Sequence, residues 1–306
     1  MQDVDPKHLI VQPVEFGGVP RLRLKDVYAV YTGQFRRWVA ITAPTSLLGS
    51  AILLMADQRI RDIYHSFPAA QISHHAADVA EAGVLRYGSF LISWFLECFA
   101  LAAVATVVNG LAKGERDDIW ISDSFQRARE HFGPLVRAAV VTSSIFVAGV
   151  AAIELILISV VGVFGWPHFA RFNYASAFVG VIVISSIVSW FGMAVPLILS
   201  ENIGAWAALK RSLNMSNGYE GFLSLLVCES VLGSFVAGYA VHYGLTFLFP
   251  TQLRYTESYG WFVSVVTILA SAAVQPPMFI GFSLLAAEGT TNSSRLPRPQ
   301  HLPHID

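Results

Sequence analysis

Charged residues are scarce in this sequence. Asp, Glu, Lys and Arg make up 13% of its 306 residues, where a soluble globular chain has about 25%. Hydrophobic residues reach 54%, and the mean hydropathy is +0.54. This scarcity excludes a water-soluble enzyme and a disordered protein, and the net charge of −1 lacks the basic excess that binds nucleic acid. The composition is that of a membrane protein with several transmembrane helices.

Sequence motifs for chemistry are absent as well. The chain has no phosphate-binding loop, HExxH zinc motif, Gly-x-Ser-x-Gly elbow or dinucleotide-binding glycine pattern. Its two cysteines, Cys98 and Cys228, lie in apolar runs, which predicts small core residues rather than a disulfide. His74 and Asp78 would share a helix face, but their spacing fits no strong metal motif. We therefore predict no catalytic residue, metal site or cofactor, and we favour a non-enzymatic protein.

Long apolar runs dominate what remains. A helix needs about 20 mostly apolar residues to cross a bilayer, because each residue adds about 1.5 Å against a hydrocarbon core of about 30 Å. No such run occupies residues 1–35, so we expect no cleavable signal peptide and insertion through internal spans. Six runs qualify as transmembrane helices: Trp38–Ala56, Ser89–Asn109, Ala138–Val163, Tyr174–Ser200, Gly221–Leu248 and Gly260–Ala287.

The basic residues are distributed unevenly between the predicted loops. About three quarters of the Lys and Arg residues lie in the N-terminal segment, in the connections after the second and fourth spans, and in the C-terminal tail. Cytoplasmic loops of membrane proteins carry this excess. We therefore predict that both termini are cytoplasmic.

Short similarities indicate an internal repeat. Ser93-Trp94-Phe95 in the second span recurs as Ser189-Trp190-Phe191 in the fourth, and an amphipathic segment precedes the first, third and fifth spans. The predicted fold is an all-α bundle of six transmembrane helices, built as three parallel hairpin repeats that each follow an interfacial helix. The predicted boundaries are 1–20 for a flexible N-terminus, 21–288 for the membrane domain with repeats at about 24–109, 119–200 and 202–287, and 289–306 for a disordered tail.

Each amphipathic segment carries one apolar stripe at spacings of three and four residues. The third segment places Ile203, Trp206, Leu209 and Leu213 on one face. Such a helix either lies in the membrane interface with its charges at the headgroups or packs on the ends of the spans. In the first case, four basic residues are candidates for headgroup contact: Arg127, Arg129, Lys210 and Arg211.

Three carboxylates, Glu97, Glu154 and Glu229, stand inside predicted spans. At about 1.5 Å per residue, all three lie near the middle of the bilayer, where an ionisable group is costly. No Lys or Arg lies at this depth, so we expect neutral carboxyl groups that hydrogen-bond to carbonyls, Ser or Thr. The alternatives are hydrogen bonds that join helices, a proton or cation site, and carboxylates that face a lumen.

Four prolines, Pro44, Pro196, Pro276 and Pro277, interrupt the first, fourth and sixth spans. Each proline frees a backbone carbonyl, which a neighbouring helix or polar group must satisfy. The resulting kinks either serve as hinges or only shape the packing.

Five of the seven tryptophans fall at or just outside the ends of the predicted spans. Tryptophan is enriched at membrane interfaces, so these five are predicted anchors. They are Trp38, Trp120, Trp166, Trp206 and Trp261.

The stretch from Pro196 to Ser212 carries a family resemblance. It reads Pro, a short apolar run, Glu201, and then Ala-Leu-Lys-Arg211-Ser212, with Gly218 soon after. This pattern resembles a family of prokaryotic six-span proteins that includes the YciC-like proteins and the membrane domain associated with glycerophosphodiester phosphodiesterases. The resemblance implies a multi-pass protein of the prokaryotic cytoplasmic (inner) membrane. It implies no phosphodiesterase activity, because the chain has no such domain attached.

Within this stretch, Glu201 has two interpretations. It either stabilises the positive end of the third amphipathic helix or joins Lys210 and Arg211 in a phospholipid site.

Three functions remain open from the sequence. The first is a membrane component that interacts with lipids or other proteins, including a second copy of itself. The second is a small-solute or ion transporter that uses the three intramembrane carboxylates. The third is a membrane-embedded lipid enzyme with paired carboxyl groups, and no sequence motif supports it. A small-residue face with Ser230, Ser234 and Gly238 would serve either internal packing or a dimer.

Overall fold

A computed structural model describes residues 23–65, 76–112, 121–164, 185–217, 219–249 and 257–295. Every secondary-structure element in these ranges is a helix, and no strand occurs among them. The predicted all-α class is confirmed for this part of the chain.

Five helices are long and apolar enough to cross a membrane, so the chain is a multi-pass helical membrane protein. They cover Phe35–Ile63, Ala80–Ala112, Phe132–Gly149, Glu220–Leu248 and Tyr259–Glu288. They match the first, second, third, fifth and sixth predicted spans. Of the fourth, Tyr174–Ser200, residues 174–184 lie outside the described residues, and the remainder belongs to the shorter apolar helix Ser185–Glu201. A sixth crossing therefore stays a prediction.

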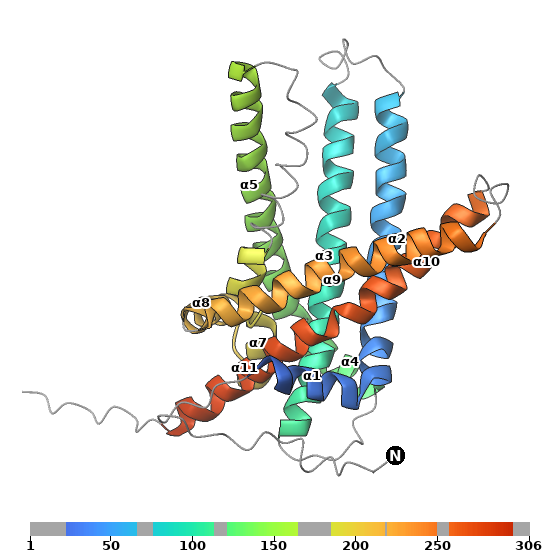
Figure 1. Cartoon of the computed structure of the whole chain (residues 1–306). Coiled ribbons are helices and arrows are strands. Elements are labelled where there is room, and N and C mark those ends of the chain that lie inside the picture. The colour runs from blue at the N-terminus through green and yellow to red at the C-terminus, as the bar shows by residue number, and fades with distance from the viewer. Residues whose placement is uncertain are drawn as a thin grey trace, which may run out of the picture.

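The bundle has two sets of long helices (Figure 1). The helices α2 (Phe35–His65), α3 (Ala76–Ala112) and α5 (Phe132–Phe164) have roughly parallel axes with alternating chain directions, and α3 packs against both others. The pair α9 (Glu220–Leu248) and α10 (Glu257–Val274) crosses this set obliquely. The chain continues from α10 into α11 (Pro276–Arg295), which packs on α3 and on α7 (Ala194–Glu201).

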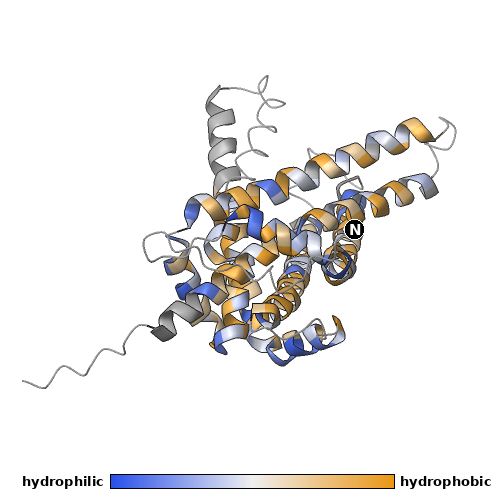
Figure 2. Ribbon diagram, turned by 60° about the horizontal axis from the view of Figure 1, so that its bottom comes forward, coloured by the Kyte–Doolittle hydropathy of each residue, from blue (hydrophilic) through white to orange (hydrophobic). Residues whose placement is uncertain are grey.

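The long helices expose apolar side chains where lipid would contact them. Exposed Leu232, Val236 and Phe247 on α9 are examples. Hydrophobic residues dominate the long helices in Figure 2, and hydrophilic residues gather in short segments. At the centre, residues 100–108 of α3 are all buried, because a run of mostly Ala and Val lets neighbouring helices approach closely.

The three predicted amphipathic segments form helices. They are α1 (Leu24–Gly33), α4 (Ile121–Glu130) and α8 (Ala205–Ser216). Each packs its apolar side on the bundle, since Val27, Ala128 and Ala208 are fully buried. Packing on the spans is therefore part of their role, and contact with lipid headgroups stays a prediction.

The predicted stripe on the third segment is only partly buried. Leu209 is buried, whereas Trp206 is 74% exposed and Leu213 is exposed too, so contact of this stripe with the membrane interface stays a prediction. The buried face instead consists of small residues together with Leu209, including Ala205, Ala208 and Ser212. Small side chains let α8 approach its neighbours closely, and the bulky Trp206 faces outward.

Trp38 also differs from its prediction as an interfacial anchor, because it is fully buried. Its indole N–H donates to the carbonyl of Val30 at 3.0 Å. Val30 lies in the last turn of α1, where carbonyls have no partner within the helix. Trp38 therefore fixes the elbow between α1 and α2. Trp206 and Trp261 are exposed, and their role as anchors stays a prediction. Trp120 and Trp166 lie outside the described residues.

The structure covers the predicted repeats and domain boundaries only in part. Trp94 of α3 lies partly buried in the bundle, whereas the corresponding Trp190 is exposed, and the three-repeat arrangement stays a prediction. The helix α11 extends to Arg295, so residues 289–295, predicted as disordered tail, are helical. Residues 1–22 and 296–306 lie outside the described residues.

Candidate functional site

The sixth predicted span is broken at Gln275, between α10 and α11. Pro276 and Pro277 have no N–H groups, so the carbonyls of Ala272 and Ala273 lose their helical partners. Side chains from elsewhere replace them. The Tyr31 hydroxyl donates to the Ala273 carbonyl at 2.5 Å, and Thr42 Oγ1 lies 3.2 Å from the Ala272 carbonyl and 3.1 Å from that of Trp38. The prediction that polar groups satisfy the carbonyls freed by these prolines is confirmed for Ala273, and the Ala272 carbonyl shares the single Thr42 hydroxyl proton with the Trp38 carbonyl.

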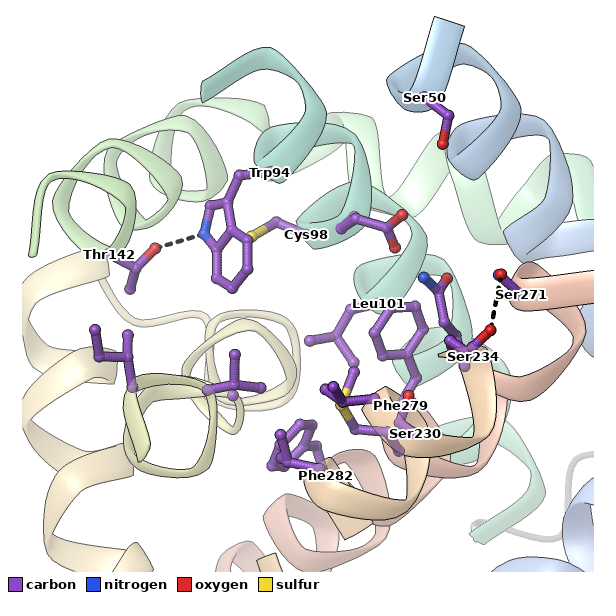
Figure 3. A pocket seen from close by; sticks show the side chains of 18 of the residues that line it. Ser50, Trp94, Cys98, Leu101, Thr142, Ser230, Ser234, Ser271, Phe279 and Phe282 are labelled. Carbon is purple, nitrogen blue, oxygen red and sulfur yellow. Dashed lines mark hydrogen bonds between the residues drawn. The ribbon is translucent and has the colours of Figure 1, made fainter. Parts of the chain in front are cut away.

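A cavity of about 900 Å³ lies beside this break, among all the major helices. Figure 3 shows Trp94, Leu101, Phe279 and Phe282 among the side chains gathered around it. Most of its wall is apolar. A space of this size and character is typical of a site for a lipophilic small molecule.

One end of the cavity is closed and the other reaches the outside of the bundle. Leu101, Ala194 and Phe282 line the closed end and are almost fully buried. Leu53, Leu54 and Tyr239 also line the cavity, but they are exposed, Tyr239 to 60%. The cavity therefore opens between α2 and the α9–α10 pair, on the apolar surface of the long helices.

A small polar cluster interrupts the apolar wall. Glu97 of α3 and Gln275 at the helix break both line the cavity, and Ser46 of α2 bridges them. Ser46 Oγ lies 3.1 Å from Glu97 Oε1 and 3.0 Å from Gln275 Oε1. A hydroxyl group has one proton, so Ser46 donates to only one of them and accepts from the other, either from a protonated Glu97 or from a rotated Gln275 amide.

The second carboxyl oxygen of Glu97 has no partner. Glu97 Oε2 is buried and makes no hydrogen bond to any described residue. A buried polar atom without a partner is costly, so it marks a position where a proton or a ligand belongs.

Other polar side chains of the cavity make hydrogen bonds to a neighbouring side chain or to the backbone. The Trp94 indole N–H donates to Thr142 Oγ1 at 2.8 Å, and Ser271 Oγ donates to the Ser234 carbonyl at 3.4 Å (Figure 3). These contacts join α3 to α5 and α9 to α10, and they leave Glu97 as the principal unsatisfied group on the wall.

The structure places Glu97 and Glu229 in different surroundings. Glu229 lies on the exposed side of α9 and accepts a hydrogen bond from the Tyr28 hydroxyl of α1. Glu154 belongs to α5, but its side chain is outside the described part of the structure. Glu97 and Glu229 have different partners, which favours different roles for them. Within the described residues, no cluster of His, Cys, Asp and Glu could hold a metal ion.

Tyr28 and Tyr31 tie α1 to the α9–α10–α11 unit. Burial and the hydrogen bond to Glu229 raise the pKa of Tyr28, and burial raises the pKa of Tyr31. Both hydroxyls therefore stay protonated at neutral pH and remain hydrogen-bond donors. They hold α1 close to the helix break.

The family-like stretch forms an elbow between α7 and α8. Glu201 ends α7, Asn202 adopts a left-handed conformation with φ 51°, and α8 begins at Ala205. Glu201 Oε1 and Arg211 Nη2 form an ion pair at 2.8 Å that closes the elbow. Lys210 points outward beside it, and Arg127 and Arg129 are exposed on α4.

Two members of the polar cluster were not anticipated from the sequence. Ser46 and Gln275 are uncharged residues in apolar runs, and such residues are usually structural. The adjacent Pro276-Pro277 pair was the available signal, because a broken helix exposes polar groups that need partners.

No family model, curated protein or solved structure matches the chain. The family resemblance of residues 196–212 therefore stays a prediction.

Proposed function

We propose that this protein is a non-enzymatic membrane component that binds a lipid-like molecule in its central cavity. The observation that carries the proposal is the cavity itself, about 900 Å³ in volume, mostly apolar and open toward the lipid-facing surface. Ligand pockets are commonly about 300–1,000 Å³ and mostly apolar, with few polar groups to orient the ligand. The cluster of Glu97, Ser46 and Gln275 supplies such groups.

The membrane setting limits what the apolar wall alone can contribute. A lipid chain that leaves the bilayer for the cavity gains little from the hydrophobic effect, because lipid tails are as apolar as the wall. Retention then depends on close packing at the closed end and on the polar cluster. The position of the mouth supports entry from the bilayer rather than from water.

Native mass spectrometry of the protein released from native-lipid nanodiscs tests the proposal. We expect a retained lipophilic molecule at a fixed stoichiometry. Ser230→Phe places a ring into the cavity and should abolish retention, because Ser230 lines it and is buried. Ser224→Phe is the matched control on the exposed side of the same helix. Absence of any retained molecule, or equal retention in both variants, would contradict the proposal.

A transporter is the second candidate, and one observation favours it. The unpartnered Glu97 Oε2 faces a cavity beside a broken helix, an arrangement that transporters use for coupling ions. In proteoliposomes loaded with a pH-sensitive dye, a transporter coupled to protons should pass protons under a potassium diffusion potential and should lose this flux in Glu97→Gln. No flux in the wild type would count against proton coupling.

The proposed setting is a prokaryotic cytoplasmic membrane with both termini inside. The uneven distribution of Lys and Arg and the exposed basic residues of α4 and α8 support this orientation. In a background without Cys98 and Cys228, an impermeant maleimide added to cells should label Gln58→Cys at the end of α2 but not Ser122→Cys on α4. Both positions are exposed.

A further inference from the structure

The described wall of the cavity has no cationic side chain. Glu97 is the only acidic residue among the described residues that line it, and no Lys, Arg or His side chain joins it there. An anionic headgroup that enters the cavity loses its hydration, and burying a charge is costly unless a cation or several hydrogen-bond donors offset the loss. The described wall offers no such cation.

The helix break also lacks the usual backbone site for an anion. A helix N-terminus binds anions through its free N–H groups. The helix α11 starts with Pro276 and Pro277, which have none, and the N–H of Met278 lies 3.1 Å from the Gln275 carbonyl. The first turn of α11 therefore offers the cavity little for a phosphate or carboxylate.

The polar cluster instead combines an acceptor with an amide. Glu97 Oε2 has no partner, and the Ser46 hydroxyl links the same carboxyl group to Gln275. A ligand hydroxyl can donate to the Glu97 carboxyl group and accept from the Gln275 amide. An ammonium group can donate to the side-chain oxygens of both Glu97 and Gln275.

We infer that the cavity selects lipophilic molecules whose polar end is a hydrogen-bond donor without negative charge, a hydroxyl or an ammonium group, held at Glu97 Oε2. This inference rests on the proposed lipid-binding function and specifies its ligand class. Anionic lipids are excluded from the cavity, whatever they do at the surface of α8.

Three photoactivatable probes test the inference on the full chain in nanodiscs of a zwitterionic lipid. They share one saturated chain with a diazirine at its tail, and they end in an alcohol, an amine or a carboxylate. The readout is the crosslinking yield to cavity-lining peptides of α3 and α9, normalised to the yield on the exposed face of α2. At neutral pH, we expect the alcohol and the amine to exceed the carboxylate by about tenfold, equivalent to about 1.4 kcal/mol.

The variant Glu97→Gln separates the two donor chemistries. Its amide keeps a hydrogen-bonding group but cannot carry a negative charge. The amine should lose its advantage, the alcohol should retain most of its yield, and the carboxylate should gain. Glu229→Gln is the matched control, because Glu229 does not line the cavity and should leave all three yields unchanged.

The outcomes distinguish this inference from the proposed function. If none of the probes labels the cavity peptides, lipid binding in the cavity is wrong and the inference fails with it. If all three label equally, if the carboxylate leads, or if Glu97→Gln leaves the ranking unchanged, the inference is overturned while lipid binding stands.

Discussion

Single side chains complete the backbone at the break between α10 and α11. Tyr31 and Thr42 come from α1 and α2, far away in the sequence, and supply donors for the carbonyls that Pro276 and Pro277 leave free. Proline in a membrane helix is tolerated only with such replacements. The break is therefore a built feature of the fold.

Removing the Tyr31 donor should destabilise the protein. Tyr31→Phe leaves the partly buried Ala273 carbonyl without a partner, which costs about 1–3 kcal/mol. Thermal unfolding in detergent would measure the loss. Tyr28→Phe should cost less, because its partner Glu229 is an exposed side chain that can turn to another conformation, whereas the Ala273 carbonyl is fixed in the backbone. Equal losses in the two variants would contradict this role for Tyr31.

The stability of the protein at high pH should depend on the ionisation of Tyr28 and Tyr31. Their pKa values are raised in the folded protein above the usual value of about 10. Their contribution is thus present below about pH 10 and is lost at higher pH, because the unfolded chain then releases protons that the folded protein still holds. We expect the wild-type Tm to fall more steeply above about pH 10 than that of the Tyr28→Phe/Tyr31→Phe double variant. Parallel curves for the two proteins would contradict this.

The sequence revealed charged residues of the site better than neutral ones. Glu97 stands out because a carboxylate in an apolar run is costly wherever it points. Ser46 and Gln275 do not stand out, because their role depends on three helices meeting. The predicted anchor role of Trp38 is wrong, since a position near a span end fits an anchor as well as a buried capping residue.

At the scale of elements, the elbow between α7 and α8 rests on one unusual backbone position. Asn202 adopts φ 51°, a left-handed conformation that Gly and Asn tolerate and β-branched residues do not. We expect Asn202→Val to lower the free energy of unfolding by about 1–3 kcal/mol and Asn202→Gly to change it little. Chemical denaturation in detergent measures both. A tolerated valine would contradict a left-handed conformation at this position.

The outer face of α8 should bind the membrane surface through Lys210. Lys210 is exposed beside Trp206, whereas Arg211 is held by Glu201. A Lys near an anionic surface contributes about 1 kcal/mol, so Lys210→Glu should reduce the retention of anionic lipid several-fold, more at low salt. Lys210→Arg is the control and should behave as the wild type. Unchanged lipid retention in Lys210→Glu would mean that α8 only packs on the spans.

The sequence predicts which segments are helical more readily than it predicts how the helices pack together. Apolar length marks the long helices, and spacing marks α1, α4 and α8, because both signals are local. The face of α8 that packs on the bundle does not follow from hydrophobicity, because small residues such as Ala205 and Ser212 are buried there. The oblique course of the α9–α10 pair depends on contacts between distant segments.

At the scale of the whole molecule, the cavity results from how the helices meet. The oblique α9–α10 pair crosses the α2–α3–α5 set, and the space between the two sets is filled only partly by side chains. Glycines keep other contacts close, as at Gly281, where an added Cβ would lie 2.4 Å from Leu226 Cδ1. No local sequence pattern predicts such a space, since it depends on the angle between two helix pairs.

Cryo-electron microscopy of the protein in native-lipid nanodiscs is the most direct test of the account. A fiducial binder would make a chain of 33.4 kDa large enough to image. We expect elongated density that enters between Leu54 and Tyr239, runs along Leu101 and Phe282, and lies within hydrogen-bond distance of Glu97. A cavity closed by repacked side chains, or occupied only by separate water-sized densities, would contradict lipid binding as the function of this protein.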